Sequence, residues 1–210
     1  MKKNFAMLAG LFLAVAGLNA QAADLRVKGY IAPVSCSFTI TNATIDYGSI
    51  NPNSLSATAP TNLPAKSTPY AVRCGGSVKA LIALKATDNR VGSSIASPHP
   101  VYSYGLGTTA QGKKIGSYLV LTRNTVVDGK AGLPITSTDN GKTWHRGSSE
   151  HLGPAPATLA TWHTGSYGPI PVNTVSGTLE VRPTINKTSE LDLNSQVSLD
   201  GHATLELRYL

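Results

Sequence analysis

The segment ATLELRY, residues 203–209, alternates apolar and polar side chains along its whole length. Successive side chains of a β-strand point to opposite faces of the sheet, so the apolar residues of this segment share one face. That face consists of Ala203, Leu205, Leu207 and Tyr209. A strand with one apolar face is half buried against a core. The segment therefore predicts a strand of a packed β-sheet.

Similar short segments recur upstream, and helix signals are almost absent. Thirteen prolines and 20 glycines interrupt the sequence, and the segments between them alternate or are rich in β-branched residues, which is typical of strands. We expect strands at residues 24–31, 37–40, 44–50, 70–74, 78–84, 115–122, 175–181 and 203–209. Residues 85–114 and 123–174 are expected to be long loops that contain hairpins. Many short strands separated by turns predict an all-β sandwich or barrel.

The first residues have the pattern of an export signal. Two lysines precede an apolar run over residues 5–18, and the sequence AQA at residues 20–22 is typical of a cleavage site. We expect residues 1–22 to be a signal peptide and residues 23–210 to form one domain, exported to the periplasm or the cell surface. The apolar run is too short to span a bilayer, which takes about 20 residues.

Composition argues against several classes of partner and of chemistry. Without the two N-terminal lysines the chain has 16 basic and 11 acidic residues, a net charge of +5. This excess is spread along the sequence and forms no basic arm for nucleic acid. Cys36 and Cys74 are the only cysteines, and an even pair in an oxidising compartment predicts one disulfide. Their spacing excludes a CxxC redox motif.

The segment STDNGKTW, residues 137–144, resembles the Asp box, a hairpin element of sialidase propellers. Its fixed positions are Ser137, Asp139, Gly141, Thr143 and Trp144. A propeller needs 4–8 blades of four strands, whereas this chain has one such box and no internal repeat. The Asp-Asn-Gly sequence tolerates positive φ, and the Asp carboxylate can accept from turn amides. We therefore expect a structural hairpin and no enzymatic activity; glycan hydrolysis is the weakest alternative.

The remaining polar residues predict no catalytic or metal site. His145, His151 and His163 lie in one loop-rich region, but their spacing matches no common metal-ligand pattern. We expect no metal and no cofactor. Aromatic side chains in the same region suit contact with a surface glycan or host receptor, although aromatic residues in loops commonly pack locally. The candidate ligand loops contain Trp144, Trp162 and Tyr167.

Several motifs, taken in order, resemble those of exported fimbrial proteins. GYIAPVSC at residues 29–36, IDYG at 45–48, the strand that ends at Cys74 and DGHATLELRYL at 200–210 resemble chaperone–usher fimbrial (pilus) subunits. The middle of the chain resembles the GltF-like exported proteins, which are described as fimbria-related. The motifs that carry this second resemblance are KATDNR at 85–90, GLG at 105–107, GKKIG at 112–116 and the terminal Tyr209-Leu210.

The resemblance implies an immunoglobulin-like, pilin-type sandwich that lacks one strand. In fimbrial subunits a periplasmic chaperone fills the open groove first, and the N-terminal extension of a neighbouring subunit, delivered through an usher, fills it later. Such strand addition uses main-chain hydrogen bonds for affinity and side-chain pockets for specificity. The complementation edge would consist of Ala203, Leu205, Leu207 and Tyr209. The competing interpretation is that this segment is an ordinary buried strand of a complete sandwich.

One departure from the fimbrial pattern bears on function. If the strand around Gly29 begins next to the cleavage site, the chain has almost no donor segment. It would then be a tip or terminating subunit that accepts a strand without donating one. The alternative is a self-complete, soluble periplasmic binding or regulatory protein, with the missing strand supplied by the loops between residues 85 and 174.

Overall fold

The computed structural model describes residues 25–29, 35–76, 78–96, 99–146, 150–165 and 168–210. The chain divides into a short N-terminal unit, Met1–Ala32, and a large unit, Pro33–Leu210. Residues 25–29 form no strand, and Leu25 and Val27 are each 91% exposed. The expected strand at residues 24–31 is therefore wrong over its described part, because an alternating segment forms a strand only where a sheet edge pairs with it. The expected signal peptide lies outside the described residues.

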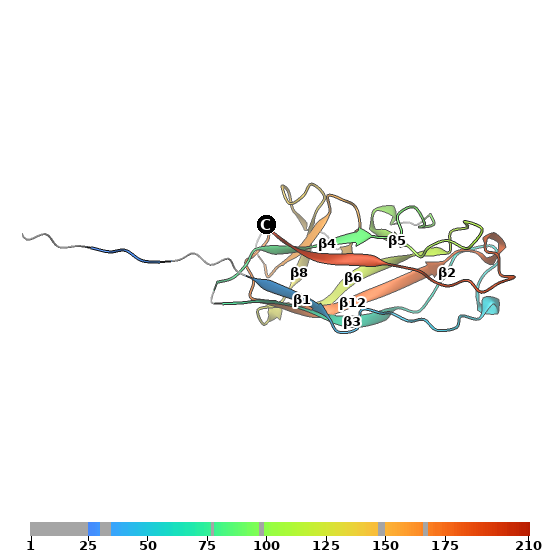
Figure 1. Ribbon diagram of the computed structural model, residues 1–210, viewed down its shortest axis with the longest axis horizontal. Coiled ribbons are helices and arrows are strands. Elements are labelled where there is room, and N and C mark those ends of the chain that lie inside the picture. Colours follow the sequence, from blue (N-terminus) through green and yellow to red (C-terminus); the bar gives the residue numbers. More distant parts are fainter. Residues whose placement is uncertain (1–24, 30–34, 77, 97–98, 147–149, 166–167) are drawn as a thin grey trace, which may run out of the picture. The chain divides into compact units, whose positions relative to one another are not determined.

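The large unit contains two antiparallel sheets (Figure 1). The larger sheet has the order β1-β3-β12-β6-β10, with β2 paired to β12 and with β5 and β7 paired to β6. Its strands are β1 (Cys36–Ile40), β2 (Thr61–Asn62), β3 (Lys66–Cys74), β5 (Ser103–Gly105), β6 (Gly116–Val127), β7 (Lys130–Ala131), β10 (His151–Leu152) and β12 (Thr174–Ile185).

The smaller sheet has the order β13-β4-β11-β8-β9. Its strands are β4 (Ile82–Asp88), β8 (Leu133–Ser137), β9 (His145–Arg146), β11 (Leu159–His163) and β13 (Ala203–Tyr209). The helical elements in the described parts of the chain are three 3-10 turns: η1 (Pro52–Ser54), η2 (Pro100–Tyr102) and η3 (Thr188–Glu190). None of the helices in these parts is long and apolar enough to cross a membrane. The predicted all-β sandwich is confirmed.

Aromatic pairs pack in the core, one of them between the two sheets and one within the larger sheet. Trp162 of β11 is 2% exposed and stacks on Tyr70 of β3, with 6.4 Å between the ring centroids. Tyr104 of β5 is fully buried and stacks on Tyr118 of β6 at 5.0 Å. Burying rings of this size contributes strongly to a core, and each ring pair adds about 0.5–1.5 kcal/mol. The core therefore connects strands of both sheets.

Three expected elements differ from the structure. Residues 44–50 were expected to form a strand but form none, because their backbone pairs with neither sheet. Residues 78–81 lie outside β4 and make a single bridge, between Ala80 and Val172. The expected loop with hairpins at 123–174 contains the β8–β9 hairpin, but it also supplies the strands β10 and β11, which the sequence did not show because they are short.

The strands β1 and β13 are edge strands of the two sheets on one side of the sandwich. Cys36, at the start of β1, meets Tyr209, at the end of β13. Ile40, at the end of β1, and Ala203, at the start of β13, line the same pocket, so the two strands run in opposite directions. Figure 1 shows β1 in blue and β13 in red, ending at the C-terminus. The side of the sandwich between these two edges is the candidate site.

Candidate strand-binding groove

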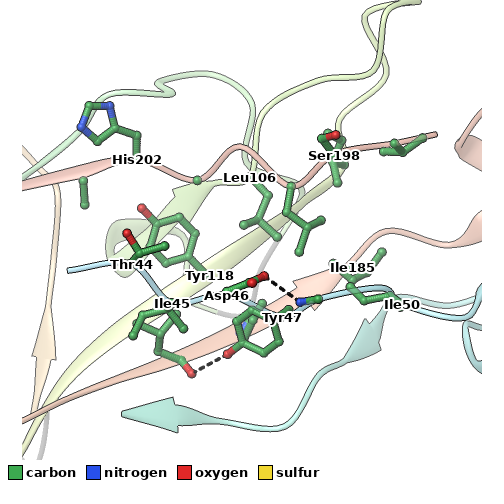
Figure 2. Close-up of a pocket in the computed structure, with 18 of the residues that line it drawn as sticks. Thr44, Ile45, Asp46, Tyr47, Ile50, Leu106, Tyr118, Ile185, Ser198 and His202 are labelled. Carbon is green, nitrogen blue, oxygen red and sulfur yellow. Dashed lines mark hydrogen bonds between the residues drawn. The ribbon is translucent and has the colours of Figure 1, made fainter. Parts of the chain in front are cut away.

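A groove of about 970 Å³, lined by both apolar and polar side chains, lies between the segment that follows β1 and the segment that leads into β13, and it reaches Ile40 of β1 and Ala203 and Leu205 of β13. We call residues 40–50, which continue from β1, the first rim, and residues 195–205, which lead into β13, the second rim. Figure 2 shows side chains from both rims around the same space. The floor comes mainly from β6, β12 and the chain before β6. It contains Leu106, Ile115, Tyr118, Val120, Val181 and Ile185.

Among the residues that the structure describes, the backbone of β13 pairs with a strand on one side only, that of β4. The amide of Leu210 donates to the carbonyl of Leu81 at 3.0 Å, and the amide of Asn89 donates to the carbonyl of His202 at 2.9 Å. Hydrogen-bonded positions alternate along an antiparallel pair, so the even-numbered residues of this segment face β4. The N–H and C=O groups of the odd-numbered residues therefore point away from β4, toward the groove side. These residues are Ala203, Leu205, Leu207 and Tyr209.

The same argument applies to β1. The amide of Thr41 donates to the carbonyl of Pro69, and the amide of Gly75 donates to the carbonyl of Ser35. Odd-numbered residues of β1 thus face β3, and the backbone groups of Phe38 and Ile40 point outward. Both edges present unpaired backbone groups at residues whose side chains are partly buried against the core.

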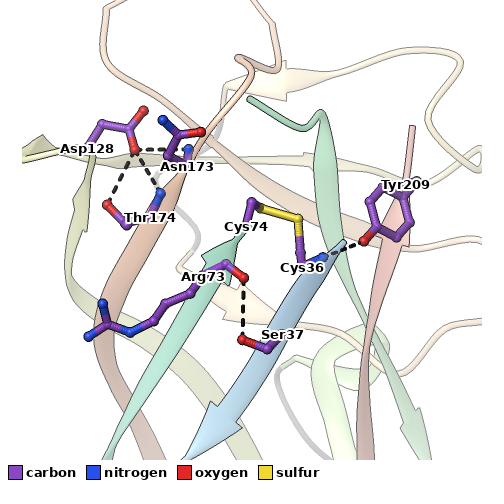
Figure 3. The surroundings of a disulfide bond; sticks show 8 residues. All are labelled: Cys36, Ser37, Arg73, Cys74, Asp128, Asn173, Thr174 and Tyr209. Atoms are coloured by element: carbon purple, nitrogen blue, oxygen red, sulfur yellow. Dashed lines mark hydrogen bonds between the residues drawn. A yellow bond between two sulfur atoms is a disulfide. The ribbon is translucent and has the colours of Figure 1, made fainter. Parts of the chain in front are cut away.

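One end of the groove is closed by covalent and hydrogen bonds. Cys36 and Cys74 are directly opposite in the register of β1 and β3 and form a disulfide, which confirms the prediction. The amide of Cys36 donates to the Tyr209 hydroxyl at 2.8 Å (Figure 3). The disulfide therefore fixes β1, and the tyrosine joins β1 to the end of β13.

Beyond Thr41, the first rim is held over the floor without strand pairing. The Tyr47 hydroxyl donates to the carbonyl of Val181 at 3.3 Å, and burial raises the pKa of this tyrosine. The ammonium group of Lys66 donates to the carbonyl of Asp46 at 2.6 Å and lies 4.8 Å from the Tyr47 ring centroid. Gly48 adopts a φ of 61°, which suits glycine, and donates to the Asp46 carboxylate. Side-chain bonds, two of them to backbone groups of the rim itself, thus position this rim over the floor.

The second rim is anchored by an ion pair. The Arg90 guanidinium donates from Nε and from one terminal nitrogen to the two Asp200 carboxylate oxygens, each at 2.8 Å. This contact raises the pKa of Arg90 and lowers that of Asp200. The amide of Asp200 also donates to the carbonyl of Leu106 at 3.0 Å. Two-point arginine–carboxylate pairs fix geometry, so the chain enters β13 at a defined position.

Tyr118 is the polar exception in the apolar floor. Its side chain is 7% exposed, and burial, followed by the nearby Asp88 charge, raises its pKa. Within the described residues its hydroxyl makes no hydrogen bond. A side chain on Gly201 would place its Cβ 2.9 Å from the Tyr118 ring. The lack of a side chain at Gly201 therefore lets the second rim pass directly over this ring.

Of the four residues of the predicted complementation edge, two line the groove and two do not. Ala203 and Leu205 line the groove, Leu207 packs against the core, and Tyr209 lies at the closed end. Sequence reasoning missed Tyr47, Tyr118 and the second rim before β13. Alternation over Val197 and Leu199, two residues apart and both partly buried, was the available signal for that rim.

The STDNGKTW segment forms the predicted type of turn. Asn140 and Gly141 have φ values of 59° and 87°. The Asp139 carboxylate accepts from the Thr143 hydroxyl at 2.6 Å, from the Thr143 amide at 2.9 Å and from the Ser137 hydroxyl at 2.7 Å. These bonds hold the pKa of Asp139 well below its usual value. The Trp144 indole donates to the carbonyl of Gly141 at 3.1 Å.

Trp144 and Trp162, the two described residues of the candidate ligand loops, do not form one aromatic surface. Trp144 is partly buried on its own hairpin, and Tyr167 lies outside the described residues. Trp162 belongs to the core, at 2% exposure, so its proposed contact with a surface ligand is wrong. It lies on β11, which has a paired strand on each side in the smaller sheet, and its ring stacks on that of Tyr70.

The three histidines belong to different strands. His145 starts β9, His151 starts β10 and His163 ends β11. Burial lowers the pKa of His151 and of His163. Across the described ranges, no group of three His, Cys, Asp or Glu side chains is arranged to hold a metal ion.

Comparison with known proteins gives two similarities. Residues 25–119 match a family model described as a protein of unknown function (DUF1120). The chain is also similar to Protein GltF of Escherichia coli (strain K12), with 24% identity over 241 residues that cover 94% of each chain. The similarity to a GltF-like protein is supported along nearly the whole chain, whereas neither comparison concerns a chaperone–usher subunit.

Proposed function

We propose that this protein is an exported, non-enzymatic fimbria-type subunit or fimbria-associated protein that binds an extended segment of a partner by β-strand complementation. The observation that carries the proposal is the pair of facing sheet edges, each with unpaired backbone groups, on either side of one groove. No catalytic arrangement is needed for this activity, because backbone and apolar contacts do the binding.

Strand addition fits the physical chemistry of the groove. Unpaired strand edges invite pairing with another chain, and proteins commonly cover or charge them. Here the inward side chains of both edges are apolar, so an inserted strand gains main-chain hydrogen bonds and burial together. Each apolar side chain that it buries fully contributes about 1.5–3 kcal/mol.

The proposed partners are a periplasmic chaperone with its usher, or a neighbouring fimbrial subunit. In the terminating-subunit version, the protein accepts a strand and has almost no donor segment before its first strand. That version assumed a strand around Gly29, whereas residues 25–29 form no strand and the first strand that the structure describes begins at Cys36. A tip or terminating subunit and a subunit that also donates a strand are therefore both part of the proposal.

The alternative function is a self-complete periplasmic binding or regulatory protein. The groove volume of about 970 Å³ lies at the upper end of the range for small-molecule sites, and Ile45 and Tyr47 already line it from within the chain. An apolar small molecule would then occupy the space that we assign to a strand. Of the candidate ligand-loop residues that the structure describes, Trp144 is the one that supports a receptor contact, because Trp162 is buried.

The test compares two lysine substitutions on adjacent residues of β13. Leu205→Lys places an ammonium group in the groove, whereas Thr204→Lys places one on the exposed face. The probe is a fluorescent nonapeptide, VKVTVKVTV, whose valines form one apolar face, and its affinity is measured by anisotropy. We expect Leu205→Lys to weaken binding at least about tenfold, since burying an unpaired charge is costly. Thr204→Lys should bind as the wild type does, and equal binding by all three proteins would contradict the proposal.

A further inference from the structure

The groove contains a residue that can select one side chain of the inserted strand. This inference rests on the proposed function. Tyr118 is a phenol in a floor that is otherwise mainly aliphatic. Its ring is fixed by stacking on Tyr104 at 5.0 Å and by the close approach of Gly201. Its hydroxyl has no hydrogen-bond partner in the described chain, although the other groove tyrosine, Tyr47, has one in Val181.

The direction of an inserted strand follows from the two edges. Since β1 and β13 run in opposite directions, the inserted strand is antiparallel to one of them and parallel to the other. Antiparallel pairing is slightly more stable per residue, and β13 with seven residues offers a longer edge than β1 with five. We therefore align the inserted strand antiparallel to β13.

This alignment fixes which positions of the occupant face the floor. Side chains directly opposite each other on an antiparallel pair lie on the same face. The inward-facing residues of the second rim and of β13 up to Leu205 are Val197, Leu199, Gly201, Ala203 and Leu205. An occupant that starts opposite Leu205 therefore has five inward positions at two-residue spacing. The third of them lies opposite Gly201, where the rim has no side chain and where Tyr118 is nearest.

We propose that the occupant is a peptide segment of a partner protein with apolar inward residues and one hydroxyl or amide side chain, such as Ser, Thr or Asn, at the position that faces Tyr118. Before insertion the Tyr118 hydroxyl borders an open groove (Figure 2). Insertion removes water from it, and an unsatisfied buried hydroxyl costs about 1–3 kcal/mol. The backbone N–H and C=O groups of the inserted strand form hydrogen bonds with the two sheet edges. The hydrogen-bond partner of the Tyr118 hydroxyl therefore has to come from a side chain of that strand.

The test uses serine and alanine versions of the nonapeptide VKVTVKVTV, with the substitution placed in turn at positions 3, 5 and 7. For the wild-type protein we expect the tightest serine peptide to bind about three- to tenfold more tightly than its alanine counterpart. Tyr118→Phe keeps the ring and its stacking but removes the hydroxyl, so the serine preference should disappear. Tyr47→Phe is the matched control, because the Tyr47 hydroxyl already has a partner, and it should keep the preference.

The outcomes separate this inference from the proposed function. Binding of the parent peptide without any serine preference in the wild type overturns the inference alone. A preference that persists in Tyr118→Phe overturns it too, because another group would then be responsible. If no peptide of the set binds the exported chain, the inference and the proposed function both fail. The wild-type serine-to-alanine ratio is decisive even if the Tyr118→Phe protein does not fold.

Discussion

The Asp-box-like hairpin and the groove differ in where their polar groups find partners. In the hairpin, Asp139 and Ser137 bond to groups within a few residues of chain, so the turn is complete by itself. In the groove, the outward backbone groups of β13 face β1 across an open space. The polar groups of the STDNGKTW hairpin are thus hydrogen-bonded within the hairpin. In β13, by contrast, the backbone N–H and C=O groups on the groove side lack a strand partner among the described residues.

This difference shows why the hairpin is structural and the groove is a candidate site. A turn whose polar groups are bonded to one another stabilises its own conformation and presents few free hydrogen-bonding groups to a partner. The groove is assembled from rims that are more than a hundred residues apart in sequence, and the edge strands β1 and β13 leave backbone groups available. The following predictions test whether the two regions are independent in this way.

The largest effect is expected from removing the disulfide. In Cys36→Ser/Cys74→Ser, β1 loses its covalent link to β3, and the free energy of unfolding should fall by about 2–5 kcal/mol. Urea unfolding of the purified protein measures this change. Native-state amide exchange should show loosening at β1 and the first rim, with the hairpin amides of Gly141 and Thr143 unchanged. Equal loosening at the hairpin would contradict the independence of the two regions.

A smaller effect, confined to the hairpin, is expected for Asp139→Asn. The pKa of Asp139 is well below its usual value of 3.8 because it accepts from Thr143 and Ser137. The unfolded chain therefore binds this proton at a higher pH than the folded chain does. The stabilisation by Asp139 is fully present above about pH 4 and is lost as the pH falls further.

Urea unfolding between pH 7 and pH 2 measures this loss. The substituted protein should be less stable than the wild type at pH 7, and the two should converge at low pH. Parallel curves would show that Asp139 is not the responsible group. Binding of the VKVTVKVTV peptide at pH 7 should be unchanged, since the hairpin is not part of the groove; weakened binding would show that the two regions are coupled.

The smallest effect is expected at the closed end of the groove. Tyr209→Phe removes the hydroxyl that accepts from the amide of Cys36. A hydrogen bond of this kind contributes about 0.5–1.5 kcal/mol, and less where it is exposed. We expect at most about 1 kcal/mol lower stability, together with faster exchange of the Cys36 amide proton. Unchanged exchange of that amide would show that the bond does not hold the two edges together.

The sequence predicted those parts of the molecule that depend on local patterns. Strand β13 agrees with its predicted bounds, 203–209, because its alternation is uninterrupted. The Asp139 turn follows from residues that are adjacent in the chain. The prediction of a strand at residues 44–50 was wrong, because the pattern of apolar and polar residues does not reveal whether another strand is available to pair with the segment. Tyr118 could not be identified because its role depends on Gly201, which is distant in sequence and close in space.

The central claim is that β13 is paired on one side only, and amide hydrogen exchange measured by NMR tests it directly. In the chain without peptide we expect slow exchange for Thr204 and Glu206, whose N–H groups face β4, and fast exchange for Ala203, Leu205 and Leu207. Saturation with VKVTVKVTV should slow the second group and leave the first unchanged. Slow exchange of all five amides in the peptide-free monomer would contradict the account, because the edge would already have a partner within the chain.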